Sequence, residues 1–154
     1  MFYEFTQNNS YGYFDVTDTV CHRLFIEADS VAEAMDKAEE LGCYWNGVTE
    51  GIDCPCCGDR WYGCAEIDLE KLQNGYEVVD YDNKKDWYEN YGKYTIVEPP
   101  QKETVFSKSR WVGKIAFSSI EEYAQYLANE YGWTTPDIRI FYKDGRVTEI
   151  FKEV

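Results

Sequence analysis

The chain has 154 residues and a formal net charge of −14, with 44% hydrophobic and 18% aromatic residues. This composition excludes a disordered chain, and the length predicts a single domain over residues 1–154 with its own core. The acidic surplus disfavours direct binding to nucleic acids or membranes, whose phosphates repel it, and favours a basic protein partner. No apolar run approaches the ~20 residues that cross a bilayer, and the N-terminus lacks a signal-peptide pattern, so we expect a cytoplasmic protein.

The N-terminal segment predicts three short strands followed by a helix. The strand segments are rich in aromatic and β-branched side chains and are separated by turn residues, which is typical of an antiparallel meander. They cover residues 2–6, 11–16 and 22–27. Ser30 and Glu33 then form a capping box, apolar residues follow at helical spacing, and Gly42 ends the helix.

The rest of the chain predicts further strands, two more helical segments and a closing hairpin. The strands cover residues 75–80, 94–97, 111–117, 138–142 and 147–151. A short helix is expected over 85–91, and a second capped helix over 119–132 begins with Ser119 and Glu122. Asp144-Gly145 closes the final hairpin. Together these elements predict an α+β fold, in which the two capped helices pack on one face of an antiparallel sheet.

A boundary is expected inside this single domain. Pro99-Pro100 predicts a break in regular structure. Residues 1–98 contain 7 basic and 21 acidic residues, whereas residues 99–154 contain 8 of each. We therefore place the boundary at 98–104, between an acidic N-terminal part and a neutral part made of a strand, a helix and a hairpin.

A cysteine-rich loop separates the first helix from the acidic segment. Cys54 and Cys57 form a C-P-x-C-G motif, the arrangement of a zinc knuckle, in which two intervening residues let both sulfurs turn toward one point. A tetrahedral zinc site needs four ligands, and we take Cys43 and Cys64 as the other two. Three further residues remain as alternative ligands: Cys21, Cys56 and His22. A metal-free turn of buried thiols explains the same pattern equally well.

The residues around the loop indicate structural roles rather than catalysis. Arg60 is expected to pair with Asp53 or Asp59 and brace the loop. His22, the only histidine, follows Cys21 on a predicted strand, where successive side chains point to opposite faces, so the two make a poor catalytic pair. The sequence lacks a phosphate-binding glycine loop, a nucleophile elbow and a zinc-protease motif. We therefore expect no enzymatic activity.

The aromatic surplus predicts a protein interface. Tyr and Trp dominate binding hot spots, and a small domain with this many aromatic residues must expose several of them. The predicted interface combines aromatic and acidic side chains, with core packing as the alternative explanation. It comprises Trp87, Tyr88, Tyr91, Tyr94, Asp80, Asp82 and Asp86.

The first 62 residues resemble a known family. The matching segments are Asn8-Asn9-Ser10 with Gly12, Glu27-Ala28-Asp29-Ser30 before a helix ending in Gly42, Asn46-Gly47, and Asp53-Cys54-x-Cys56-Cys57-Gly58-Asp59-Arg60-Trp61-Tyr62. With these segments the chain resembles a family of small tailed-bacteriophage proteins of unknown function, and the last block is the most specific. The resemblance implies a phage accessory product in the cytoplasm of the host cell. It transfers no catalytic residues.

These observations predict a non-catalytic phage protein that binds a host protein and inhibits or redirects it. The expected partner is a basic nucleic-acid-binding or defence factor, because the surface is acidic and rich in tyrosine. One alternative is a protein that sequesters a small nucleotide signal, with phosphate contacts from Lys108, Arg110, Lys114, Arg139 and Arg146. The other is a metal-dependent enzyme that uses either the acids Asp80, Asp82 and Asp86 or the pair Asp53 and Asp59.

Overall fold

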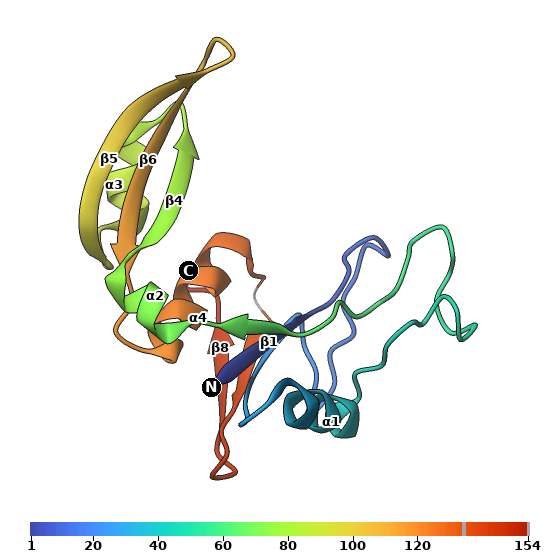
Figure 1. Cartoon of the computed structure of the whole chain (residues 1–154). Helices are drawn as coiled ribbons and strands as arrows, with labels where there is room; N and C mark the ends of the chain where they lie inside the picture. The colour runs from blue at the N-terminus through green and yellow to red at the C-terminus, as the bar shows by residue number, and fades with distance from the viewer. Residues whose placement is uncertain (134, 154) are drawn as a thin grey trace. The chain divides into compact units, whose positions relative to one another are not determined.

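The computed structural model describes residues 1–133 and 135–153, and the chain divides into two compact units. Unit 1 comprises Met1–Ile67 and Ala124–Val154, and unit 2 comprises Asp68–Tyr123. Both units combine helices with sheets (Figure 1), so the predicted α+β class is confirmed. Residues 98–104, where a boundary was predicted, lie inside strand β5 (Thr95–Val105), and the chain divides at other positions. No helix in the described part of the chain has the length and apolar character needed to cross a bilayer.

Unit 1 contains a five-stranded mixed sheet. The strands are β1 (Phe2–Thr6), β2 (Arg23–Glu27), β3 (Ala65–Ile67), β7 (Pro136–Phe141) and β8 (Val147–Phe151). Their order is β3-β1-β2-β7-β8. All neighbours are antiparallel except β2 and β7, which pair in parallel although more than a hundred residues separate them in the chain. The sequence predicted β1, β2 and the final hairpin, but not this parallel pairing.

The predicted strand over residues 11–16 is wrong, because this segment is part of a loop between β1 and β2. The side chain of Gln7 replaces a neighbouring strand as the hydrogen-bonding partner. Its Nε2 donates to the carbonyl oxygens of Asp15 and Cys21, both at 2.7 Å, and its Oε1 accepts from the Asp15 N–H at 2.9 Å. One buried amide therefore satisfies backbone groups that a sheet would otherwise have to pair.

Helix α1 (Val31–Leu41) covers one face of this sheet. Ser30 Oγ accepts from the Glu33 N–H at 3.2 Å and Gly42 ends the helix at φ 121°, as predicted. The buried face of the helix consists of Ala34 and Ala38, both 0% exposed. These small side chains allow a close approach to a layer of larger strand residues. That layer includes Tyr3, Phe5, Leu24, Ile26 and Phe141.

Helix α4 (Ile120–Tyr131) begins as predicted, with Ser119 Oγ accepting from the Glu122 N–H at 3.2 Å. Its buried residues Leu127 and Ala128 line a small cavity together with Arg23 and Ile138. These strand residues alternate with those under α1, so they belong to the other face of the sheet. The two capped helices therefore cover opposite faces and not one face as expected. This arrangement explains why β7 is buried along nearly its whole length.

Unit 2 is built on a three-stranded antiparallel sheet in the order β4-β6-β5, with β4 (Tyr76–Tyr81) and β6 (Lys108–Ala116) beside the long β5. Helix α3 (Lys84–Tyr91) lies along one face (Figure 1), and a short helix α2 (Leu69–Asn74) precedes β4. Trp87 of α3 is fully buried over Gly113, where an added Cβ would lie 2.6 Å from the indole ring. A glycine is therefore required at this position in the sheet.

The predicted break at Pro99-Pro100 is wrong, since β5 continues through both prolines. A proline lacks an N–H donor, but β5 is an edge strand and needs only one hydrogen-bonded neighbour. The register shifts between Ile96 and Gln101 absorb the irregularity. The β5–β6 hairpin turns at Phe106 and Ser107, which both have positive φ.

Candidate metal centre

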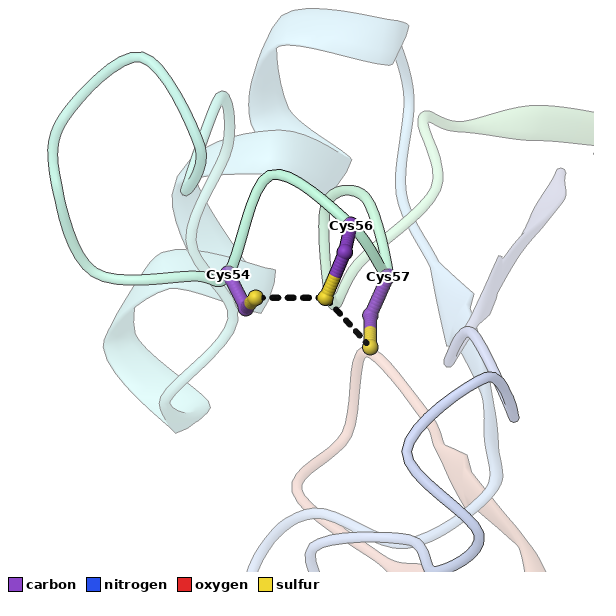
Figure 2. A group of neighbouring side chains, drawn as sticks. All are labelled: Cys54, Cys56 and Cys57. Carbon is purple, nitrogen blue, oxygen red and sulfur yellow. Dashed lines mark hydrogen bonds between the residues drawn. The ribbon is translucent and has the colours of Figure 1, made fainter.

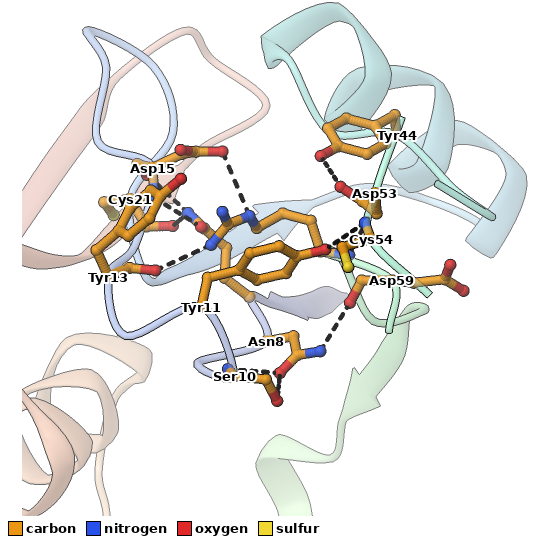
Figure 3. A network of polar contacts seen from close by, with 12 residues as sticks. Asn8, Ser10, Tyr11, Tyr13, Asp15, Cys21, Tyr44, Asp53, Cys54 and Asp59 are labelled. Atoms are coloured by element: carbon orange, nitrogen blue, oxygen red, sulfur yellow. Dashed lines mark hydrogen bonds and ion pairs between the residues drawn. The ribbon is translucent and has the colours of Figure 1, made fainter. Parts of the chain in front are cut away.

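The segment between α1 and β3 forms a long loop without helix or strand, apart from a single bridge between Gln7 and Trp61. Asp53 organises it from within (Figure 3). One carboxylate oxygen of Asp53 accepts from the Tyr44 hydroxyl and the other from the Arg60 N–H, both at 2.8 Å. Gly47 passes so close that an added Cβ would overlap this carboxylate. The loop is therefore held in one conformation by side chains inside it.

Arg60 connects this loop to the β1–β2 loop. Its side chain is 4% exposed, and the guanidinium lies over the rings of Tyr11 and Tyr13, at 4.1 and 5.0 Å from their centroids. It donates to the Tyr13 carbonyl oxygen at 2.9 Å and lies 3.5 Å from the Asp15 carboxylate. The expected bracing role agrees with these contacts, but the ion-pair partner is Asp15. Asp53 instead binds the backbone N–H of Arg60.

Two residues of the β1–β2 loop position the cysteines themselves. Asn8 is buried and its Nδ2 donates to the carbonyl oxygens of Cys57 and Asp59, at 2.7 and 3.1 Å. The Tyr11 hydroxyl donates to the Gly58 carbonyl oxygen and accepts from the Cys54 N–H (Figure 3). Asn8 and Tyr11 were not predicted as part of the site. Their contacts span more than forty residues of sequence, and no local pattern reports them.

Three cysteines gather at the exposed end of this loop (Figure 2). The Sγ atoms of Cys54 and Cys56 are 2.7 Å apart, those of Cys56 and Cys57 are 3.6 Å apart, and all three lie within 4.8 Å of one another. The contact with Cys56 lowers the pKa of Cys54, and the same contact raises the pKa of Cys56 to about 11. Cys54 therefore loses its proton more readily than a free cysteine does. Cys56 keeps its proton and can donate it in the hydrogen bond to the Cys54 sulfur. This cluster could bind a metal ion.

The structure corrects the predicted ligand set of Cys43, Cys54, Cys57 and Cys64. Cys43 follows Gly42 and turns into the core of unit 1, where it is 4% exposed and burial raises its pKa to about 12. Cys64 packs against the same core, and burial raises its pKa as well. Neither sulfur belongs to the group of neighbouring sulfurs in the described residues, which consists of Cys54, Cys56 and Cys57. Cys56, which was only an alternative ligand, belongs to the cluster.

The predicted aromatic interface is wrong for three of its four rings. Trp87, Tyr91 and Tyr94 are 0%, 5% and 7% exposed and form part of the core of unit 2. The spacing of Trp87 and Tyr91 places both on the inner face of α3, where a sheet of three strands offers few other large side chains. Only Tyr88, on the outer face, is exposed.

The acidic residues of the predicted interface have local roles. Asp86 lies in the first turn of α3 and exchanges hydrogen bonds with Asn83, while Asp82 lies in the preceding turn with φ 65°. Burial raises the pKa of Asp80, and the nearby Asp86 adds to this shift. In the described residues, the only group of three or more potential metal ligands with neighbouring ligand atoms is the cysteine cluster, and Asp80, Asp82 and Asp86 are not part of it.

Four of the five cations considered for phosphate binding have local partners, whereas Lys108 and Arg110 line one cavity of about 550 Å³. Arg110 pairs with Glu103 at 2.7 Å, Lys114 with Glu98 at 3.4 Å, and Arg146 with Asp144 at 2.7 Å. Arg139 is buried and donates to the carbonyl oxygens of Thr17 and Val20. These contacts hold four of the five cations in local interactions, and the nucleotide site stays a prediction.

Two predicted alternative ligands remain: Cys21 is fully buried in the core of unit 1, and His22 lies against Asp137 rather than near the exposed cysteines. Comparisons with curated proteins and with solved structures found no match. The family model described as a domain of unknown function, DUF7296, matches residues 1–97, more than half of the chain, and the protein therefore belongs to this family.

Proposed function

We propose that this protein is a non-catalytic binding protein whose unit 1 docks a basic segment of another protein. The observation that carries the proposal is an acidic groove beside α1, with a volume of about 480 Å³. Four carboxylates line it: Glu27, Glu33, Asp36 and Glu40. Buried apolar side chains line it as well, namely Ile26, Ala28 and Phe141. A peptide that carries both lysine or arginine and an apolar side chain matches this lining.

The charge distribution supports a basic partner for unit 1 in particular. Unit 1 contains 7 basic and 18 acidic residues, a net charge of −11, whereas unit 2 contains 8 basic and 11 acidic residues, a net charge of −3. The two lysines at the groove are already paired, Lys37 with Glu40 and Lys143 with Asp29. Glu27 and Glu33 each use one oxygen to accept a backbone N–H, and their other oxygens, together with Asp36, can bind an incoming cation. The resemblance to phage proteins makes a basic nucleic-acid-binding or defence factor of the host cell the partner class in this proposal.

The docking proposal predicts a strongly salt-dependent interaction with a short basic peptide. A peptide of alternating lysine and leucine should bind the intact protein, and its Kd should rise by about tenfold or more between low and physiological salt, because salt screens exposed charge pairs. The double substitution D36K/E40K should weaken binding further. Isothermal titration calorimetry at several salt concentrations measures both effects.

The control variant D18K/E50K makes the same change in net charge at two exposed residues of unit 1 outside the groove. It should weaken binding much less than D36K/E40K. If both variants weaken binding equally, the peptide responds only to overall charge and the groove is not the docking site.

We also propose that the cysteine cluster holds a structural zinc ion. Zinc prefers thiolate ligands at about 2.3 Å, which places sulfurs of a tetrahedral site about 3.8 Å apart. The 3.6 Å separation of the Cys56 and Cys57 sulfurs fits this geometry. The sulfur of the exposed Cys54 needs to move about 1 Å away from the sulfur of Cys56. The fourth ligand comes from water or from a partner, since the described residues supply three.

The zinc proposal predicts about one metal ion per purified chain by elemental analysis. The variant C54S/C57S should lose the ion, because serine is a poor zinc ligand. The variant C43A/C64A should retain it, since Cys43 lies in the core, Cys64 packs against it, and neither belongs to the cluster. Equal metal content in the two variants, or no zinc in the unmodified protein after growth with added zinc, would contradict the assignment.

A further inference from the structure

His22, the single histidine, is held by specific contacts that the proposed docking function does not use. Its Nδ1 is 3.2 Å from a carboxylate oxygen of Asp137, which is 2% exposed. The same carboxylate accepts from the Trp133 N–H at 2.5 Å and from the Lys152 N–H at 3.1 Å. Gly132 also passes so close that an added Cβ would meet this carboxylate. Two backbone donors and the close approach of Gly132 therefore fix Asp137 in its position beside His22.

This arrangement decides which nitrogen of the imidazole carries the proton. An ionised carboxylate only accepts hydrogen bonds, so the neutral ring must hold its proton on Nδ1 to bind Asp137. Burial lowers the pKa of His22, against the opposite effect of Asp137, and favours the neutral ring. The lone pair then lies on Nε2. Asp137 is the only polar partner of the imidazole in the described chain, so Nε2 is left as an unused acceptor.

Aromatic side chains hold the ring and surround the space next to it. The Phe14 ring lies on the imidazole with a centroid distance of 3.7 Å, and Trp133 meets it edge-on at 6.4 Å. His22, Phe14 and Trp133 line a cavity of about 270 Å³ together with Tyr13 and Val16. Three of these side chains are unusually exposed for their type: Tyr13 is 59%, Trp133 57% and Val16 42% exposed. Asn9 and Thr135 line the cavity as well. A largely apolar cavity with a few polar groups is the usual form of a small-molecule site.

We propose that this cavity binds a small planar aromatic molecule that donates an N–H or O–H to Nε2 of His22. The exposed rings of Tyr13 and Trp133 supply stacking surfaces, and the Asp137–His22 pair supplies the one directional contact. Asp137 acts as a positioning residue, because it orients the imidazole and does not line the 270 Å³ cavity. The ligand needs no negative charge, since no lysine or arginine lines this cavity among the described residues.

The presence of one histidine makes a direct test feasible. A long-range ¹H–¹⁵N spectrum of the intact protein contains a single imidazole, which reports its tautomer without further assignment. At pH 7.5 we expect the neutral Nδ1–H form. Addition of indole should then shift the Nε2 resonance in the direction of an accepted hydrogen bond. 1-Methylindole, which has no donor, should bind about fivefold more weakly and leave that resonance in place.

Matched variants separate a built site from general affinity for aromatic molecules. Trp133→Ala should weaken indole binding about tenfold, while Tyr62→Ala, which removes a comparably exposed ring outside the cavity, should leave it unchanged. Asp137→Asn should shift the tautomer equilibrium and abolish the preference for indole over 1-methylindole, with thermal unfolding as the check that the variant is folded. An Nε2–H tautomer in the unmodified protein, or equal affinities for indole and 1-methylindole, would overturn the proposal.

Discussion

Trp87→Ala is expected to lower the free energy of unfolding of unit 2 by about 3–5 kcal/mol. The indole is fully buried, contacts the ring of Tyr91 at 5.2 Å between centroids, and covers Gly113 in the centre of the sheet. Truncation leaves a cavity that the small unit cannot fill by rearrangement. Hydrogen exchange should therefore show loss of protection for the amides of β4 and β6 in the full-length protein.

Tyr88→Ala is the matched control for this prediction, because it removes the next aromatic residue of the same helix. Tyr88 is 42% exposed, and its loss should change stability by about 0.5 kcal/mol or less. If Trp87→Ala leaves protection in β4 and β6 unchanged, the assignment of Trp87 to the core is incorrect. The pair also separates the two explanations of the aromatic surplus, since a core residue affects folding and an interface residue affects binding.

Arg60→Ala is expected to lower the free energy of unfolding of unit 1 by about 2–3 kcal/mol. The substitution removes a cation that contacts the faces of two tyrosine rings, worth about 1–2 kcal/mol when desolvated, and a charged hydrogen bond to the Tyr13 carbonyl oxygen. It also removes the contacts that connect the β1–β2 loop to the loop that carries the cysteines. Urea denaturation followed by tyrosine and tryptophan fluorescence measures the change in stability.

The control for this second prediction is Arg146→Ala. Arg146 also stacks on a tyrosine ring, at 4.4 Å from the Tyr142 centroid, and pairs with Asp144, but its side chain is 69% exposed. Exposed contacts of this kind contribute about 0.5 kcal/mol, because water screens the charge. Equal losses in the two variants would mean that burial of Arg60 adds nothing to the stability of the loop.

Two buried arginines, Arg60 and Arg139, hold the loop between β1 and β2 in place. Arg60 and Arg139 are 4% and 5% exposed, and each binds backbone carbonyl oxygens of the β1–β2 loop. Both have an Nε atom without a hydrogen bond, but an acidic side chain lies 3.4–3.5 Å away in each case. The loop that carries Asn8, Tyr11 and Phe14 is therefore fixed from two sides, which positions it for both candidate sites.

The local sequence determined those elements whose signals are complete within a few residues. Ser30 with Gly42, Ser119 with Glu122, and Asp144-Gly145 correctly predicted the two capped helices and the final hairpin, because caps and tight turns depend on neighbouring backbone groups. The C-P-x-C-G motif likewise identified the position of the cysteine cluster, and composition indicated the acidic surface.

Only the tertiary structure decided which residues meet across long stretches of sequence. The parallel pairing of β2 with β7, the clamp from Asn8 to Cys57 and the contact of His22 with Asp137 all join distant segments. Burial likewise placed Trp87 and Cys43 in cores and left Cys56 exposed beside its neighbours. A sequence pattern reports the chemical character of each side chain, whereas exposure and long-range contacts depend on how the whole chain packs.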